Sequence, residues 1–169
     1  AVGAGTNTIA YSYDGINWTG LGAAIFTSQG YGIAWNGQMW NIVGTGTNTI
    51  AYSYDGFNWI GLGATIFSTA SYGVATNGQM WVAVGEGTNT IAYSYNGINW
   101  TGLGTSMFSS FGWEVAWNGS MWVAVGQGTN NTIAYSVDGI TWTGLGMIFS
   151  ISGNDVAWNG SMWVAVGSG

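Results

Sequence analysis

Short apolar runs alternate with turn-forming residues along the whole chain. In the copy of this pattern that begins at Tyr31, the pairs Asn36-Gly37 and Asp55-Gly56 each separate two apolar runs. Such pairs favour the tight turns of β-hairpins, because both central residues of those turns need positive φ. The predicted strands of this copy are residues 31–35, 39–43, 49–54 and 57–60. No window has the period of an amphipathic helix, so the pattern predicts a four-stranded antiparallel meander.

The same unit occurs four times along the chain. Met-Trp pairs recur at intervals of 41 residues, beginning at Met39, Met80, Met121 and Met162. The Ile-Ala-Tyr-Ser segment keeps this interval until an extra residue, in Asn130-Asn131, makes its last step 42 residues. Repeats of this length are typical of propellers, solenoids and arrays.

The predicted strands are apolar on both faces. In one of them, Trp81, Ala83 and Gly85 alternate with Val82 and Val84. A sheet that is apolar on both sides must be covered on both sides, as it is between the radially packed blades of a propeller. We therefore predict an all-β fold, a β-propeller of four-stranded antiparallel blades with about 41 residues per blade. A stacked solenoid is the alternative.

The two chain ends hold complementary parts of one further repeat. We predict a single domain, 1–169, with blades at 31–62, 72–103 and 113–145 and a composite blade made of 155–169 and 1–20. The composite blade would close a four-bladed ring without leaving a free sheet edge. A segment of a longer array, or half of an eight-bladed dimer, would give the same pattern. The start at Ala1 rather than Met is expected of a mature product or an excised segment.

A recurring motif occupies the corner between the third and fourth predicted strands. It reads Ser-Tyr-Asp-Gly-Ile-Asn-Trp at residues 12–18, with counterparts at 53–59, 94–100 and 136–142. The motif resembles the Asp-box of sialidase-like (BNR-type) β-propeller repeats, Ser-x-Asp-x-Gly-x-Thr-Trp, shortened so that Asp and Gly are adjacent. The resemblance covers the whole chain as repeats and implies a propeller with structural corners. It does not imply sialidase activity, because those enzymes clamp their substrate with arginines and this chain has none.

The residues of these corners are therefore assigned structural roles. An Asp or Asn side chain can accept hydrogen bonds from the backbone N–H groups that follow it, and Gly supplies positive φ. The indole is expected to pack between sheets. The corner residues are Asp14, Asp55, Asn96 and Asp138, with Trp18, Trp59, Trp100 and Trp142.

Composition excludes several classes of function. The chain has no Lys, Arg, His or Cys, and its six acidic residues give a formal net charge of −6. Nucleic acids and anionic membranes recruit basic residues, and both histidine-dependent triads and Cys/His zinc sites need residues that are missing. No apolar run of about 18 residues indicates a transmembrane helix. We expect no cofactor, no metal, no nucleic-acid partner and no membrane insertion.

The copies differ most on one predicted face, where the loops after the second strands meet the linkers between blades. Variable loops on a constant scaffold often carry function, although loops also drift where little constrains them. The candidate ligand-binding residues on this face are Tyr31, Tyr72, Glu86, Trp113, Glu114, Gln127, Asn154 and Asp155. Trp113 is the one Trp outside the repeat pattern, and Asn130, in a loop sequon, is a candidate for glycosylation.

We expect a non-catalytic, extracellular or cell- or virion-surface module for binding or adhesion. Aromatic rings with nearby amides and carboxylates suit a glycan in a lectin-like site, and Tyr and Trp also suit protein surfaces. Charged residues make up only 4% of the chain, which favours self-association. The alternative is therefore a self-assembling structural subunit of a fibre, virion or surface layer. A glycosidase using Glu114 and Asp155 as a carboxylate pair is the third and least favoured hypothesis.

Overall fold

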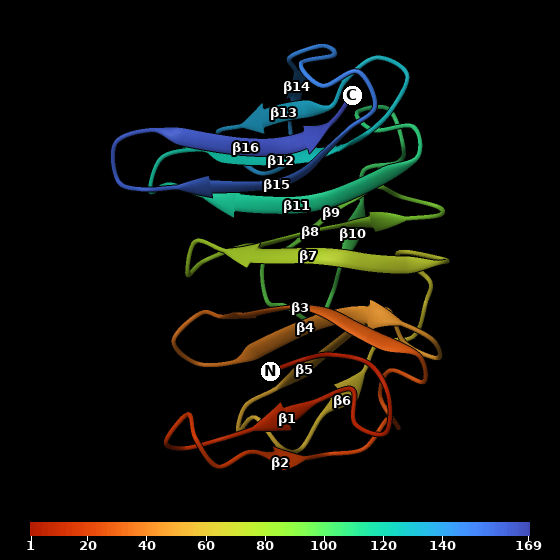
Figure 1. Cartoon of the computed structure of the whole chain (residues 1–169), viewed down its shortest axis with the longest axis vertical. Helices are drawn as coiled ribbons and strands as arrows, with labels where there is room; N and C mark the ends of the chain where they lie inside the picture. The colour runs from red at the N-terminus through yellow and green to blue at the C-terminus, as the bar shows by residue number, and fades with distance from the viewer.

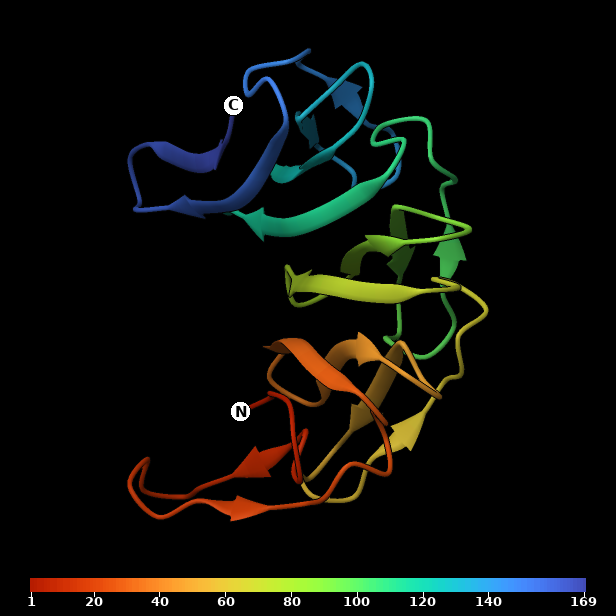
Figure 2. The same ribbon diagram turned by 45° about the vertical axis from the view of Figure 1, so that its right-hand side comes forward.

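The computed structural model describes the whole chain, residues 1–169. It contains sixteen β-strands and no helix, and all paired strands run antiparallel. The strands form successive units that stack one on the next (Figure 1), and Figure 2 shows that the stack curves into an open arc. The prediction of an all-β, antiparallel fold is confirmed.

Three whole units lie in the interior of the chain. The first whole unit comprises β3 (Gln29–Trp35), β4 (Trp40–Thr45), β5 (Ile50–Ser53) and β6 (Ile60–Gly61). The second comprises β7 (Ala70–Thr76), β8 (Trp81–Glu86), β9 (Ile91–Ser94) and β10 (Thr101–Gly102). The third comprises β11 (Phe111–Trp117), β12 (Trp122–Gln127), β13 (Ile133–Ser136) and β14 (Thr143–Gly144). Each strand pairs with the next, so each unit is the predicted meander.

The predicted fourth strand, residues 57–60, is wrong in its bounds. β6 begins at Ile60 and holds two residues, because the preceding residues belong to the corner. The backbone N–H groups of Phe57 and Asn58 donate to Asp55 Oδ1 over 3.0 and 2.8 Å, and the indole N–H of Trp59 donates to the Gly56 carbonyl over 3.1 Å. These bonds leave only a short strand to pair with β5.

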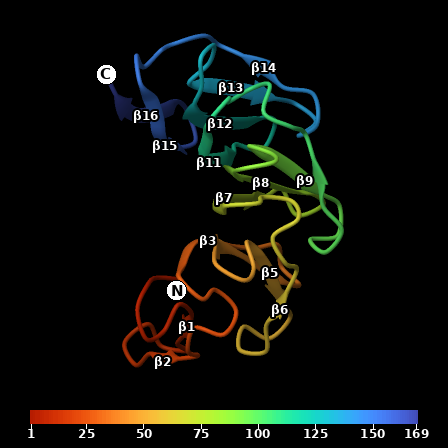
Figure 3. The ribbon, with the colours of Figure 1, turned by 90° about the vertical axis from the view of Figure 1, so that its right-hand side faces the viewer.

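The chain ends form two separate two-stranded sheets. β1 (Ala10–Tyr11) pairs with β2 (Thr19–Gly20), and β15 (Ser152–Trp158) pairs with β16 (Trp163–Ser168). No strand pairing joins β16 to β1. Figure 3 shows β1–β2 at one end of the stack and β15–β16 at the other. The composite unit of 155–169 and 1–20 therefore stays a prediction.

The first strand of each unit lies on the inner side of the arc. β3 contacts β7, β7 contacts β11, and β11 contacts β15. Figure 2 shows these strands on the concave side, with β6 and β10 on the convex side. Anything bound inside the arc would therefore meet the first strands.

The core lies between units rather than within them. Met80, Val82 and Val84 of the second whole unit pack against Trp122 and Ala124 of the third. The corresponding residues Met39, Val43, Trp81 and Ala83 form an equivalent cluster between the first and second whole units, where buried Asn41 takes the position of Val82. Alternate residues of each second strand thus face opposite neighbours, which explains why these strands are apolar on both faces.

The four corners share one hydrogen-bond pattern, shown here for Asp138. Its Oδ1 accepts from the backbone N–H groups of Thr141 and Ile140 over 2.7 and 2.9 Å and from the Ser136 hydroxyl over 2.9 Å. These bonds, led by the Thr141 N–H, lower the pKa of Asp138 to about 2. Asn96 accepts the same two backbone bonds, over 3.0 and 2.8 Å. An uncharged acceptor therefore suffices to shape the corner.

Replacing Asp138 with Ala is expected to lower the free energy of unfolding by about 1 kcal/mol at pH 7, because two backbone donors lose their acceptor. Asp138→Asn should retain most of the stability, as Asn96 does in its own corner. Because the pKa of Asp138 is lower in the folded state than in the unfolded state, its ionised carboxylate stabilises the fold above about pH 4. This stabilisation is lost as the pH falls through the pKa of the folded state. Urea denaturation at pH 7 and pH 3 should thus show the Asp–Asn difference shrinking at pH 3. Equal destabilisation by Asn and Ala would contradict this role.

Candidate ligand-binding face

Every inner strand carries a β-bulge near its first residues. The pairing of β3 shifts between Gly30 and Gly32, and equivalent shifts occur in β7, β11 and β15. The extra residues at these bulges are Tyr31, Tyr72, Trp113 and Asn154. A bulge leaves its extra residue out of the ladder and redirects the side chain. Four predicted site residues therefore occupy one structural position on neighbouring inner strands.

Three of these residues join one more ring in a cluster that we call the concave aromatic row: Tyr31, Tyr72, Phe111 and Trp113. The ring centroids of Tyr31 and Tyr72 lie 5.0 Å apart, and those of Tyr72 and Trp113 lie 4.5 Å apart. Phe111 stacks on Trp113 at 5.1 Å with an interplanar angle of 20°. Tyr31 is 40% exposed and the other three rings are half-buried. The row is therefore a surface of mutually packed aromatic rings that is partly open to solvent.

Phe111 was missed by the sequence analysis. Its counterparts in the other copies are Gln29, Ala70 and Ser152, so the third copy alone is aromatic there. Comparing the copies at this position would have revealed it, because it is as exceptional as Trp113. In the structure Phe111 pairs with Gln127 on one side and Glu86 on the other.

Two polar side chains predicted for the site lie beside the row. The hydroxyl of Tyr72 donates to Glu86 Oε2 over 2.8 Å. Burial, reinforced by this acceptor, raises the pKa of Tyr72 above its ordinary range, so the phenol stays protonated and keeps the bond. Gln127 ends β12 opposite Phe111. The structure thus brings Glu86 and Gln127 together with the aromatic residues.

Glu114 follows the bulge of β11 and lies against the second whole unit. A Cβ added to Gly73 would lie 2.8 Å from Glu114 Oε1, so the missing side chain of Gly73 makes room for this carboxyl group. Its Oε1 accepts from the Val115 N–H over 2.9 Å. Burial raises the pKa of Glu114 to about 7, and the negative charge of Asp155 adds to the shift. Burial therefore moves the ionisation of Glu114 towards neutral pH.

The fourth copy contributes differently. Asp155 is exposed, and its Oδ1 accepts from the Val156 N–H over 2.7 Å. Asn154 is also exposed and accepts from the Ser152 hydroxyl over 2.7 Å. Neither is part of the aromatic row, although both stand on the next inner strand. Asn130 is exposed in the loop between β12 and β13, and its glycosylation stays a prediction.

The corners lie away from this face. β3 begins beside the row at Gln29 and ends at Trp35, next to the Asn36 turn. The paired residues Trp40 and Ser53 place the Asp55 corner at that same far end. The structure therefore separates the corner residues from the candidate binding residues.

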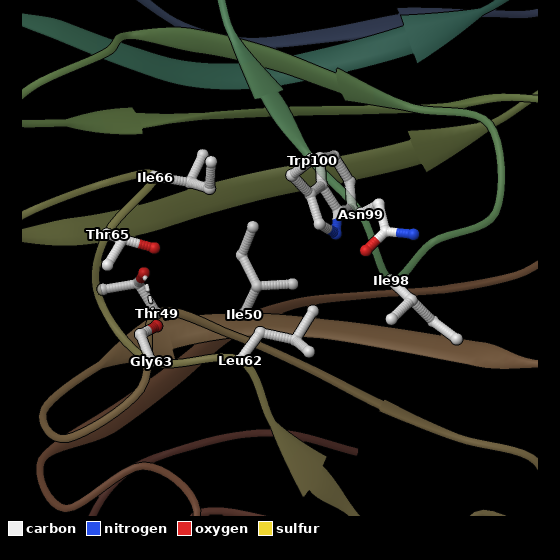
Figure 4. Close-up of a pocket in the computed structure, with 9 residues that line it drawn as sticks. All are labelled: Thr49, Ile50, Leu62, Gly63, Thr65, Ile66, Ile98, Asn99 and Trp100. Atoms are coloured by element: carbon white, nitrogen blue, oxygen red, sulfur yellow. Dashed lines mark hydrogen bonds between the residues drawn. The ribbon is translucent and has the colours of Figure 1, made fainter.

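A groove also occurs between neighbouring units. Figure 4 shows it between the first and second whole units, where Ile98 and Trp100 reach over Ile50 and Leu62, and its volume is about 230 Å³. An equivalent groove of about 300 Å³ lies at the next junction. Because it repeats with nearly the same lining, we interpret this groove as a feature of unit packing and not as a specific site.

Comparisons with known proteins assign no function to this chain, so a function has to be argued from the geometry of the structure. A scan against models of protein families finds no match, and a search of the curated proteins finds no matching sequence. The structure has no helix long and apolar enough to cross a membrane. No group of three or more potential metal-binding side chains is close enough to hold an ion.

Replacing Glu114 with Gln is expected to stabilise the protein at alkaline pH. The folded pKa of about 7 exceeds the ordinary value of 4.5, so the folded state binds the proton more tightly and stability falls as pH rises through this interval. Gln keeps an acceptor for the Val115 N–H and cannot ionise. Allowing for partial exposure, we expect a gain of about 1–2 kcal/mol at pH 8 and none at pH 4.

The measurement is urea denaturation of the wild type and the variant between pH 4 and pH 8. Asp155→Asn serves as the control, because it removes the neighbouring charge and should move the wild-type transition to lower pH. Parallel stability curves for the wild type and Glu114→Gln would contradict the shifted pKa.

Proposed function

We propose that this chain is a non-catalytic β-propeller module that binds glycans on its concave aromatic row. Four-stranded repeats with Asp-box-like corners support the propeller assignment, in which a segment 155–169 and a segment 1–20 together complete one blade. The observation that carries the functional proposal is the clustering of Tyr31, Tyr72, Phe111 and Trp113 beside Glu86 and Gln127. Rigid aromatic rings supply contact area at low entropic cost.

The chemistry of the row favours neutral sugars. An aromatic face can stack on the apolar face of a pyranose ring, while carboxylates accept hydrogen bonds from hydroxyls and an amide both donates and accepts. The net charge of −6 and the absence of any Lys or Arg disfavour sialic acid and other anionic sugars. We therefore propose uncharged glycans on a cell or virion surface as the ligand class.

Catalysis is not part of the proposal. In Glu114 and Asp155, one oxygen of each carboxyl group accepts the N–H of the residue that follows it. This shared bond is a structural role that needs no substrate. We propose that the two groups shape the concave face and adjust its charge.

The test is a glycan array probed with the wild type and with Trp113→Ala. We expect binding to a set of neutral glycans that Trp113→Ala loses, and no preference for sialylated ones. Trp35→Ala is the control, because Trp35 also stands on an inner strand but lies at the opposite end of β3, away from the row, and is 41% exposed. Absence of binding to any glycan, or equal binding by Trp113→Ala, would overturn the proposal.

A further inference from the structure

The last strand of the chain exposes residues that are buried in its copies. β8, β12 and β16 share the sequence Trp-Val-Ala-Val-Gly. Val82 and Val84 are fully buried in β8, whereas Val164 and Val166 of β16 are 50% and 55% exposed. Met162 is 56% exposed, whereas Met80 is 5% exposed. The difference arises because no following unit covers β16. These exposed residues form what we call the C-terminal end face.

A large apolar groove adjoins this end face. Its volume is about 520 Å³, and all ten lining residues are hydrophobic, among them Ile133, Leu145 and Ile148. At the two whole junctions an Ile–Trp pair of the next unit lines the matching groove, which measures only about 230 and 300 Å³: Ile98 with Trp100, and Ile140 with Trp142. The β15–β16 sheet has only two strands, so no Ile–Trp pair lies over this groove.

The missing pair stands exposed at the opposite end of the molecule. Ile16 and Trp18 occupy the same repeat position on the β1–β2 sheet, and they are 82% and 53% exposed. A second cleft, of about 370 Å³, lies between that sheet and the first whole unit. Ile16, Trp18 and this cleft form what we call the N-terminal end face.

The second cleft lacks a methionine that both whole junctions contain. A Cβ added to Gly97 would lie 3.1 Å from Met39 Sδ, and one added to Gly139 would lie 2.7 Å from Met80 Sδ. At Gly56, which lines the cleft, the nearest atoms belong to Trp40, at 3.6 Å or more. The repeat position that would fill this place is that of Met162.

The two end faces are therefore complementary in both directions. We propose that a second copy of this chain docks head to tail, so that β1–β2 of one copy completes the β15–β16 pair of the other. Ile16 and Trp18 fill the large apolar groove, while Met162 enters the cleft beside Gly56. The contact repeats the packing that the chain already uses twice within itself.

The register of the new strand pair follows from the whole units. Val82 pairs with Tyr93 and Val123 pairs with Tyr135, so Val164 of one copy pairs with Tyr11 of the other. In the single chain this edge of β1 is partly covered by the N-terminus, since Ala1 and Ala10 exchange two backbone hydrogen bonds of 2.8 and 3.0 Å.

Residues 1–5 occupy the edge of β1 that β16 of a second copy would take, and they can be displaced from it. Residues 1–5 read Ala-Val-Gly-Ala-Gly and residues 165–169 read Ala-Val-Gly-Ser-Gly. Exchange therefore keeps the same backbone bonds, while β16 adds pairings through Trp163 and Val164 that residues 1–5 do not reach. It also buries the apolar residues of both end faces, which favours the exchange.

A second copy fits better than the other end of the same chain. The arc is open, and the two end sheets lie apart in both Figure 2 and Figure 3. The whole junctions bury equivalent residues, so bending the arc further would disturb each of them. An interface between different faces of identical chains forms either a closed ring or an extended filament.

Single-cysteine variants test this contact directly, because the chain has no Cys. Ala10 forms a hydrogen-bonded pair, and hydrogen-bonded and non-hydrogen-bonded pairs alternate along an antiparallel ladder. The next pair, Tyr11 with Val164, is therefore non-hydrogen-bonded, with Cα atoms about 4.5 Å apart. This separation suits a disulfide. Mixing Tyr11→Cys with Val164→Cys under oxidising conditions should give a covalent dimer of the two variants. Tyr13→Cys mixed with Val164→Cys is the control, since Tyr13 is 89% exposed and outside the register.

The outcomes separate the possibilities. Cross-linking between the Tyr11 and Val164 variants well above the control supports the contact, and cross-linking no greater than the control overturns it. A variant that carries both Tyr11→Cys and Val164→Cys distinguishes contacts within a chain from contacts between chains. In this variant, a disulfide formed only within single chains would mean that the chain closes on itself, which also overturns the proposal. Disulfides between chains, seen as covalent dimers or longer ladders on a non-reducing gel, support it.

Sedimentation velocity adds a test that needs no cysteine. The wild type is expected to sediment above the 17.7 kDa of one chain, and Ile16→Asp is expected to return it to that mass. Ile60→Thr is the matched control, because Ile60 is 54% exposed and three other copies carry Thr at this position. A wild type that sediments with the mass of one chain at protein concentrations up to 100 μM would overturn the proposal. So would assembly that Ile16→Asp leaves unchanged.

Discussion

Replacing Trp81 with Ala is expected to lower the free energy of unfolding by about 3–5 kcal/mol. Trp81 is 1% exposed and packs with Met39, Val43 and Ile50 of the first whole unit. Because the core lies between units, removing this indole leaves a cavity at a junction and weakens the contact between two meanders. Urea denaturation followed by far-ultraviolet circular dichroism measures the change.

The same substitution at Trp163 is the matched comparison. Trp163 occupies the equivalent position on β16 but lies beside the open apolar groove and is half-buried. We expect Trp163→Ala to cost about 1–2 kcal/mol, because less apolar surface returns to water. Both substitutions should be made with Ile16→Asp, which keeps the end faces apart. Equal losses at the two positions would contradict the account of junction packing.

Replacing Gly126 with Ala is expected to have the second large effect, a loss of about 3 kcal/mol. A Cβ at this position would overlap the carbonyl oxygen of Phe111 and lie 2.7 Å from Cγ of Phe108. The Phe108 ring is fully buried and the carbonyl belongs to a paired strand, so neither can move without disturbing its surroundings. Every unit has a glycine here and a Phe from the linker beside it, as Gly44, Gly85 and Gly167 show.

The control for Gly126→Ala is Gly3→Ala. A Cβ on Gly3 would meet nothing within 4 Å, so the substitution should change stability by less than about 0.5 kcal/mol. Thermal unfolding by calorimetry compares the two variants. A Gly126→Ala protein as stable as Gly3→Ala would show that the linker Phe does not rely on this glycine.

Local parts of the fold could be predicted from the sequence because they depend on neighbouring residues. The Asn36-Gly37 turn and the Asp55 corner define hairpins through their own hydrogen bonds, and the strands between them follow. The start of β6 was misplaced, because the pattern at Phe57 does not reveal that its N–H bonds to Asp55. The pairing of the chain ends depends on the curvature of the whole arc, which no local pattern specifies.

The candidate site was predictable only in part. The variation among copies identified Tyr31, Tyr72 and Trp113, and the structure shows their rings in contact. The bulges that align them depend on pairing register and were not visible in the sequence. Phe111 lies in the row because β11 of the third whole unit pairs with β8 of the second, where Phe111 is opposite Glu86. Asn154, which also occupies a bulge, did not join the row because its side chain bonds locally to Ser152.

The central claim is that the concave aromatic row is the binding surface. Titration calorimetry with the strongest-binding neutral glycan from the array tests this claim most directly. Trp113→Ala is expected to weaken binding at least about tenfold, or about 1.4 kcal/mol, while Trp35→Ala should stay within about twofold of the wild type. A Trp113→Ala protein that binds the glycan as tightly as the wild type would contradict the account.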